Sequence, residues 1–197
     1  YKYFMEDTIE KQYNKSFFVF IQDIINTRFN WKDLDILSAN SLIDIDIISN
    51  SPKYLWNYTW LSKNTNIDIT FVKKNIKNNW NMYWLSSNNS ITFPDIISTP
   101  EFEWNYSSLS LNTNISTDIV SNYSELPWNY INLSKNISTN INYVLQHLDK
   151  NWDFYSLSSN PSVTIEHILN YPYLKWDYSC LSLNPNITVG IVKDKYW

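Results

Sequence analysis

The sequence predicts an all-α solenoid of seven repeats, in which each copy of about 24 residues forms two short helices, one of them either α or 3₁₀ in type. Three observations support this prediction. Tryptophans recur at a fixed spacing, a constant Leu-Ser pair and a constant Asn follow them, and a second apolar series closes the copies. The copies begin at Trp31, Trp56, Trp80, Trp104, Trp128, Trp152 and Trp176. The predicted array therefore covers residues 31–197, behind a capping region at residues 1–30.

The capping region contains the stretch SFFVFIQDIINTRF. Phe17, Phe20, Ile21 and Ile24 lie on one stripe of a helix that begins after Ser16, a candidate N-cap. Because an end repeat has an apolar face without a neighbouring repeat, this stretch is predicted to be a capping helix.

The first half of a copy reads WNYxxLS or a close variant, and its aromatic residues and Leu can share one helical face for less than two turns. We call this predicted short helix helix A. The Asn two residues after the Ser is predicted to end it as a left-handed cap, because the chain has a single Gly to take that role. Pro161 and Pro185 follow that Asn directly and cannot continue a helix.

The second half of a copy places a short polar residue between two apolar residues, as expected for the N-cap of a second helix, helix B. These residues are Asp68, Thr92, Ser116, Thr164 and Thr188. The copy at Trp128 departs from the pattern, since Thr139 stands in the position of Ile, and Ile137 or Ile141 is expected to fill that core position. Strands are the alternative interpretation, because Ile, Tyr and Trp favour them.

A unit of 24 residues cannot bury enough apolar surface to offset its ordering entropy, so the copies must stack on one another. The phased Trp, Leu and Ile residues are therefore predicted to form the core, with an aromatic ligand cage as the alternative.

Two resemblances follow from these phrases. The string LSLNPNIT followed by IV resembles the leucine-rich repeat variant family, which implies a right-handed stack of alternating α and short 3₁₀-type helices. The phrase WNY…LSxNxNI is more similar to repeat proteins of giant DNA viruses of the mimivirus type, whose composition rich in Asn, Ile, Lys and Tyr is also similar. The resemblance covers residues 31–192, implies a viral origin and transfers no catalytic residue.

Groups suited to catalysis are few. A phosphate loop needs several glycines, and the lone cysteine, Cys180, is interpreted as a small buried residue. His147 and His167 lie at different phases of their copies. The carboxylates that suggest a pair or a cation site, but are interpreted as solvated surface, are Glu101, Glu103, Asp33, Asp35, Asp44 and Asp46. We expect no catalytic residue, no cofactor and no metal.

The expected function is a non-catalytic scaffold that binds a protein partner. Candidate contacts are Trp60 and Trp84, which stand where other copies have Ser or Asn, and four lysines of the second copy. These lysines are Lys63, Lys73, Lys74 and Lys77. Nucleic-acid binding and a structural role in a virion are the alternatives, although a net charge of −4 disfavours a nucleic-acid partner.

The location of the protein is predicted from what the sequence does not display. The longest apolar run, residues 17–21, is far shorter than the roughly 20 residues that span a bilayer, so no membrane partner is expected. No signal peptide is visible. The expected setting is therefore intracellular, in the host cytoplasm or a viral factory, or in the virion.

Overall fold

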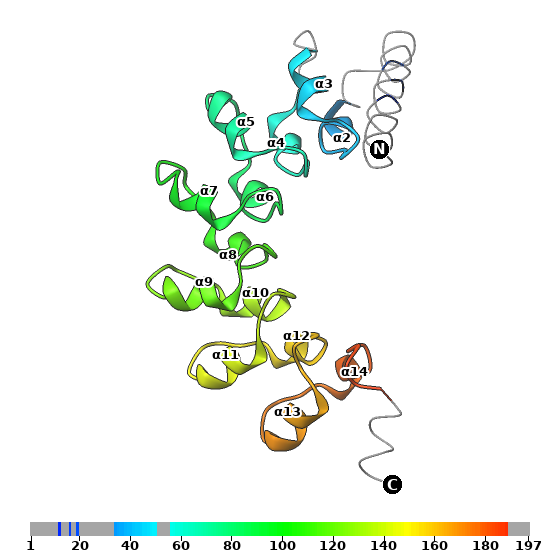
Figure 1. Cartoon of the computed structure of the whole chain (residues 1–197), viewed down its shortest axis with the longest axis vertical. Helices are drawn as coiled ribbons and strands as arrows, with labels where there is room; N and C mark the ends of the chain where they lie inside the picture. The colour runs from blue at the N-terminus through cyan, green and yellow to red at the C-terminus, as the bar shows by residue number, and fades with distance from the viewer. Residues whose placement is uncertain (1–11, 13–15, 17–18, 20–33, 51–55, 189–197) are drawn as a thin grey trace, which may run out of the picture. The chain divides into compact units, whose positions relative to one another are not determined.

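The computed structural model of the chain describes residues 34–50 and 56–188, together with Gln12, Ser16 and Val19. All regular elements in this part are short α-helices, as predicted (Figure 1). The thirteen helices are α2 (Leu34–Ser38), α3 (Ile45–Asn50), α4 (Tyr58–Leu61), α5 (Ile69–Lys74), α6 (Met82–Ser86), α7 (Phe93–Ile97), α8 (Tyr106–Leu109), α9 (Thr117–Asn122), α10 (Tyr130–Lys135), α11 (Ile141–Gln146), α12 (Phe154–Ser158), α13 (Ile165–Asn170) and α14 (Tyr178–Leu181). Apart from three isolated positions, the predicted capping helix lies outside the described residues, as does helix B of the seventh copy.

The chain divides into two compact units, Tyr1–Ile91 and Thr92–Trp197. In the first unit α2, α4 and α6 are helices A, and α2 packs against α4. In the second unit α8, α10, α12 and α14 are helices A, and α12 packs against both α10 and α14. The helices B of the second unit lie together on the other side of this stack (Figure 1). Each unit is thus a stack of helix pairs, which confirms the predicted all-α solenoid fold.

The residue after the phased Trp is the N-cap of helix A. The side chain of this N-cap residue accepts a hydrogen bond from a backbone amide of the first turn. In α4, for example, Asn57 accepts from the Trp60 amide at 3.2 Å. The six N-caps of this kind are Asn57, Asn81, Asn105, Asn129, Asp153 and Asp177. The constant Asn or Asp of the sequence phrase therefore fixes where helix A starts.

Helix B begins at the predicted N-caps in four copies. Asp68 accepts a hydrogen bond from the Phe71 amide at 2.7 Å. The caps at Thr92 and Thr164 are reinforced from the third helical residue. Asp95 accepts from the Thr92 amide at 2.8 Å, and His167 Nδ1 accepts from the Thr164 amide at 3.1 Å. The fourth of these caps is Ser116.

The copy at Trp128 keeps the fold without the expected exchange of core residues. Thr139 itself occupies the position of Ile, and this residue is only 1 % exposed. Its hydroxyl donates to the Leu133 carbonyl at 2.6 Å. Ile137 is exposed, whereas Ile141 is buried as the first residue of α11, after the N-cap Asn140. A buried hydroxyl is tolerated here because it has a hydrogen-bond partner.

The core consists of the predicted series. The phased Trp residues of the described copies are buried, except for the half-buried Trp80, and the Leu five residues after each of them is buried. The Ile or Val series is also buried, up to the half-buried Ile187. Aromatic pairs join consecutive copies edge to face, as in Tyr130 with Trp152 at 5.0 Å between ring centroids.

The constant Asn does not form a left-handed cap, so this prediction is wrong: within the described residues no backbone φ is positive. The Asn side chain instead bonds to the preceding copy. The Asn136 amide group donates to the carbonyls of Ser110, Asn112 and Ile115 at 3.2, 2.9 and 3.1 Å, while its oxygen accepts from the Ser138 amide. Asn64 makes the same three donations to Ser38, Asn40 and Ile43.

The constant Ser and Trp also join parts of the backbone. Ser62 donates its hydroxyl hydrogen to the Tyr58 carbonyl and accepts from the Asn81 amide of the next copy at 2.9 Å. The Trp128 indole donates to the Tyr123 carbonyl five residues earlier, at 2.8 Å. The constant Asn, Ser and Trp are thus engaged within the stack.

Candidate partner-binding face

Exposed residues that vary between copies include those of helix A and of the turn that follows it. We define the helix A face as the exposed and half-buried residues two to ten positions after the phased Trp. The corresponding segments are residues 58–66 and 82–90 in the first unit and residues 106–114, 130–138, 154–162 and 178–186 in the second. The buried Leu, Ser and Asn of these segments support the exposed side chains from below.

In the first unit this face carries a cluster formed by Trp60, Lys63 and Trp84. The two indoles are half-buried, and their ring centroids lie 5.4 Å apart at an interplanar angle of 40°. The Lys63 ammonium lies 3.8 Å from the Trp84 ring centroid and 4.8 Å from that of Trp60. A cation at these distances is attracted by the negative faces of both rings. Lys63 and Trp84 also border a hollow of about 250 Å³.

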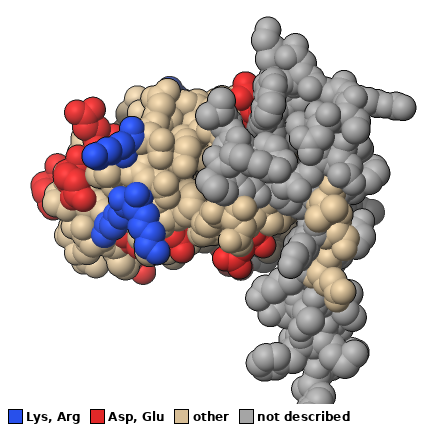
Figure 2. Space-filling view, turned by 90° about the horizontal axis from the view of Figure 1, so that it is seen from above, with Lys and Arg blue, Asp and Glu red and all other residues tan. Residues whose placement is uncertain are grey.

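The other three candidate lysines are not part of this cluster. Lys73 and Lys74 lie in the last turn of α5, a helix B, and Lys77 follows in the next turn. All three are exposed, and positive charge at the carboxyl-terminal end of α5 interacts favourably with the helix dipole. In Figure 2 the basic side chains of the visible surface have acidic side chains close by. The structure thus unites Trp60, Trp84 and Lys63 and leaves the remaining lysines on the helix B side.

In the second unit the same face contains a groove of about 290 Å³ that spans three copies. Its lining includes Lys135 at the end of α10, Ile137 after α10, Tyr155 on α12, and Leu183 after α14. Ile137, Tyr155 and Leu183 are exposed by 65, 61 and 75 % although they are large and apolar. Sequence reasoning missed these residues. For Leu183 the signal was the change of residue type, among Lys, Ser and Leu, seven residues after the phased Trp.

Cys180 and Ser156 form part of the groove wall. Cys180 is buried, as predicted, and a hydrogen bond with its side chain raises the pKa of the Tyr155 hydroxyl. Tyr155 therefore stays protonated to higher pH than an ordinary tyrosine.

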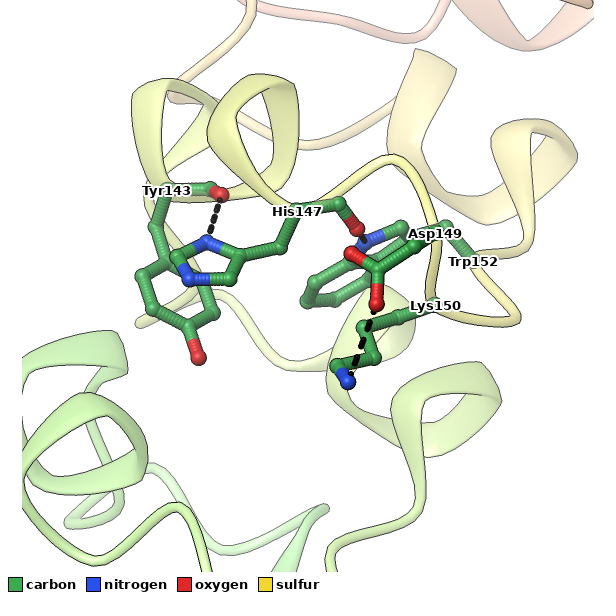
Figure 3. Close-up of polar contacts among 5 residues, drawn as sticks. All are labelled: Tyr143, His147, Asp149, Lys150 and Trp152. Atoms are coloured by element: carbon green, nitrogen blue, oxygen red, sulfur yellow. Dashed lines mark hydrogen bonds and ion pairs between the residues drawn. The ribbon is translucent and has the colours of Figure 1, made fainter.

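His147, one of the two candidate bases, belongs to a turn after α11 (Figure 3). Its ring stacks on Tyr143 at 4.1 Å, and its Nδ1 lies 2.8 Å from the Tyr143 carbonyl, to which it must donate. Its own carbonyl accepts from the Trp152 indole at 2.8 Å. Burial, with the charge and hydrogen bonding of Tyr130 and the charge of Asp149, raises the pKa of Tyr143 to about 12. These contacts hold the turn together.

The remaining candidate acids and the second histidine are distributed over the fold. Asp35 accepts from the Asn57 amide group at 2.7 Å, Asp44 accepts from the Ile47 amide of α3, and His167 supports the cap of α13. Glu101 and Glu103 are exposed, and Asp33 lies outside the described residues. Over residues 34–50 and 56–188, no three His, Cys, Asp or Glu side chains gather as metal ligands would.

Among the helices of the described segments, none has the length and apolar character needed to cross a membrane. Comparison of the chain with protein-family models, with curated proteins and with solved structures finds no match.

Proposed function

We propose that this chain is a non-catalytic repeat scaffold that binds a protein partner through its helix A face. The observation that carries the proposal is the groove of the second unit, where exposed apolar side chains from three copies surround one hollow. Apolar side chains that gather around a groove are typical of interaction sites.

The repeat provides the rigidity that such a site needs. The Asn, Ser and Trp hydrogen bonds hold consecutive copies in register, so the side chains of α10, α12 and α14 are presented at fixed spacing. A preorganised surface loses little conformational freedom on binding, which favours affinity. Variation at the exposed positions then changes the partner without changing the fold.

The test is a tagged pull-down with mass spectrometry, run at low and high salt and with and without nuclease. The double variant Ile137→Ser/Leu183→Ser removes apolar surface from the groove. Its matched control is Ile97→Ser/Leu169→Ser, which removes exposed apolar side chains from helices B of the same unit. We expect a protein that survives salt and nuclease and is lost only with the groove variant. Capture unaffected by the groove variant contradicts the proposal.

A second candidate function, binding of single-stranded nucleic acid, is favoured by the cluster of Trp60, Lys63 and Trp84. Bases stack on indole rings, and a neighbouring lysine can meet a phosphate. This function predicts that a labelled oligonucleotide binds the chain, and that Trp60→Ala/Trp84→Ala abolishes this binding. The net charge of −4 weighs against it, because nucleic-acid affinity comes mainly from phosphate contacts.

The setting proposed for either function is an infected host cell or a virion. It rests on the resemblance of the WNY…LSxNxNI phrase to giant-virus repeat proteins. Detection of the protein in purified virions, or in infected cells only, would separate the two locations.

A further inference from the structure

The helix A face differs in charge from the rest of the molecule. Its six segments, from residues 58–66 to residues 178–186, contain two lysines, Lys63 and Lys135, and no Asp or Glu. The remainder of residues 56–188 carries ten carboxylates and five lysines, a net formal charge of −5. Within the second unit, the lining of the groove includes Lys135 and no carboxylate although the protein is acidic, which points to a partner that brings negative charge.

Two carboxylates lie next to the groove and must be considered. Asp153 and Asp177 are the N-caps of α12 and α14. Asp153 accepts hydrogen bonds from the Tyr155 amide at 3.2 Å and the Ser156 hydroxyl at 2.7 Å, and Asp177 accepts from the Cys180 amide at 2.8 Å. Their charges face the amino-terminal amides of short helices, and they also act on Tyr155, where both help to raise the pKa of the hydroxyl. Lys135, the last residue of α10, is the cation that borders the hollow.

The lining favours a peptide over a nucleic acid. A nucleic acid would bring a phosphate at every nucleotide, whereas the groove offers one lysine. Its exposed walls are Ile137, Leu183 and Pro161, aliphatic groups that suit an apolar side chain, and the aromatic ring of Tyr155. A hollow of about 290 Å³ lies at the lower end of the size of ligand pockets, roughly 300 Å³, so it suits one or two side chains of a longer segment.

We propose that the groove bordered by Lys135, Ile137, Tyr155 and Leu183 binds an acidic peptide segment that carries a large apolar anchor residue. The anchor fills the hollow against Ile137 and Leu183, and an acidic neighbour of the anchor pairs with the Lys135 ammonium. This inference rests on the proposed function, since it names the chemistry of the partner at the same face.

The experiment is selection of a random displayed peptide library on the full chain. Nonspecific attraction to a protein of net charge −4 would enrich basic peptides, so enrichment of acidic ones is informative. We expect selected peptides that combine Asp or Glu with Leu, Ile, Phe or Met. Basic or uncharged peptides, or no enrichment over the Ile137→Ser/Leu183→Ser variant, would overturn the inference.

Fluorescence anisotropy of the most enriched peptide then tests the role of Lys135. The variant Lys135→Glu is expected to weaken binding by about fivefold or more, because attraction becomes repulsion. The matched control Lys73→Glu makes the same change at the exposed end of α5, away from the groove, and should leave the affinity unchanged. Circular dichroism checks that both variants fold. Equal affinity of the Lys135→Glu variant contradicts the inference, as does displacement of the peptide by an oligonucleotide.

Failure here can be told apart from failure of the proposed function. If the pull-down captures a protein that depends on Ile137 and Leu183 while acidic peptides are not selected, the scaffold function stands and the acidic partner is wrong. If neither experiment depends on these residues, both proposals fall.

Discussion

The Trp60–Lys63–Trp84 cluster and the Lys135 groove occupy the same positions of the repeat in two different units. Lys63 and Lys135 both lie seven residues after a phased Trp. Trp60 and Trp84, in the copy of Lys63 and the next one, correspond to Asn132 and Ser156 around Lys135. Both lysines border a hollow, of about 250 Å³ at Lys63 and about 290 Å³ at Lys135. With two indoles at the variable position the lysine lies over aromatic rings, whereas Lys135 has small polar residues there. One backbone thus presents its lysine in two different settings.

The largest effect is expected from removing the Asn hydrogen bonds that join consecutive copies in both units. Asn64→Ala and Asn136→Ala each remove three donations to buried carbonyls, and a buried acceptor without its partner costs about 1–3 kcal/mol. We expect each variant to lower the free energy of unfolding by about 2–4 kcal/mol in urea denaturation. Asn122→Ala, at the exposed end of α9, is the control and should change it by less than about 0.5 kcal/mol.

The next test converts the groove at Lys135 into a cluster like that of Trp60, Lys63 and Trp84. Asn132→Trp/Ser156→Trp should place two indoles around Lys135, as Trp60 and Trp84 surround Lys63. Because the new rings occupy the groove, the acidic peptide selected on the native chain should bind at least about tenfold more weakly in fluorescence anisotropy. Ser124→Trp, in an exposed turn of the same unit, should bind it normally. Unchanged binding by the double variant would show that the peptide lies elsewhere.

A smaller effect on stability is expected within the cluster of Trp60, Lys63 and Trp84. In a double-mutant cycle of Lys63→Gln and Trp84→Leu, the coupling free energy should be about 0.5–1 kcal/mol, the usual strength of an exposed cation–π pair. Urea denaturation of the four proteins gives this value. The cycle of Lys77→Gln with Trp84→Leu is the control and should give no coupling. A coupling near zero for Lys63 would mean that its position over the rings contributes nothing to stability.

The sequence predicted the fold well because its determinants are local. The Trp period, the buried Leu and Ile series and the N-caps at Asp68 or Ser116 are readable within one copy. The role of Asn136 was not, because its partners lie about one repeat earlier and are adjacent only after stacking. A single copy suggests a turn residue, and a stack is required to show a cross-link.

The site was predictable in part for a related reason. Trp60 and Trp84 were predicted as contacts because a large residue stands where other copies have small ones, and the structure brings them together with Lys63. Lys73 and Lys74 are close to Lys63 in sequence but belong to helix B, so the structure places them apart from that cluster. Ile137 and Leu183 resemble core residues by type, and only their exposure identifies them as surface.

The smallest expected effect concerns Tyr155 and Cys180 in the wall of the groove at Lys135. The hydrogen bond with Cys180 raises the pKa of Tyr155, so the protonated phenol is favoured in the folded protein. Cys180→Ala removes this bond, and the pKa of Tyr155 should fall toward the ordinary value of about 10. The signal can be followed by NMR titration of ¹³C-labelled tyrosine, with Tyr155→Phe to assign the resonance.

At a pH near that value the Cys180→Ala variant would carry more phenolate in the groove, which repels a carboxylate. Its affinity for the acidic peptide should therefore begin to fall at lower pH than that of the native chain. Identical titration curves would mean that Cys180 only fills space.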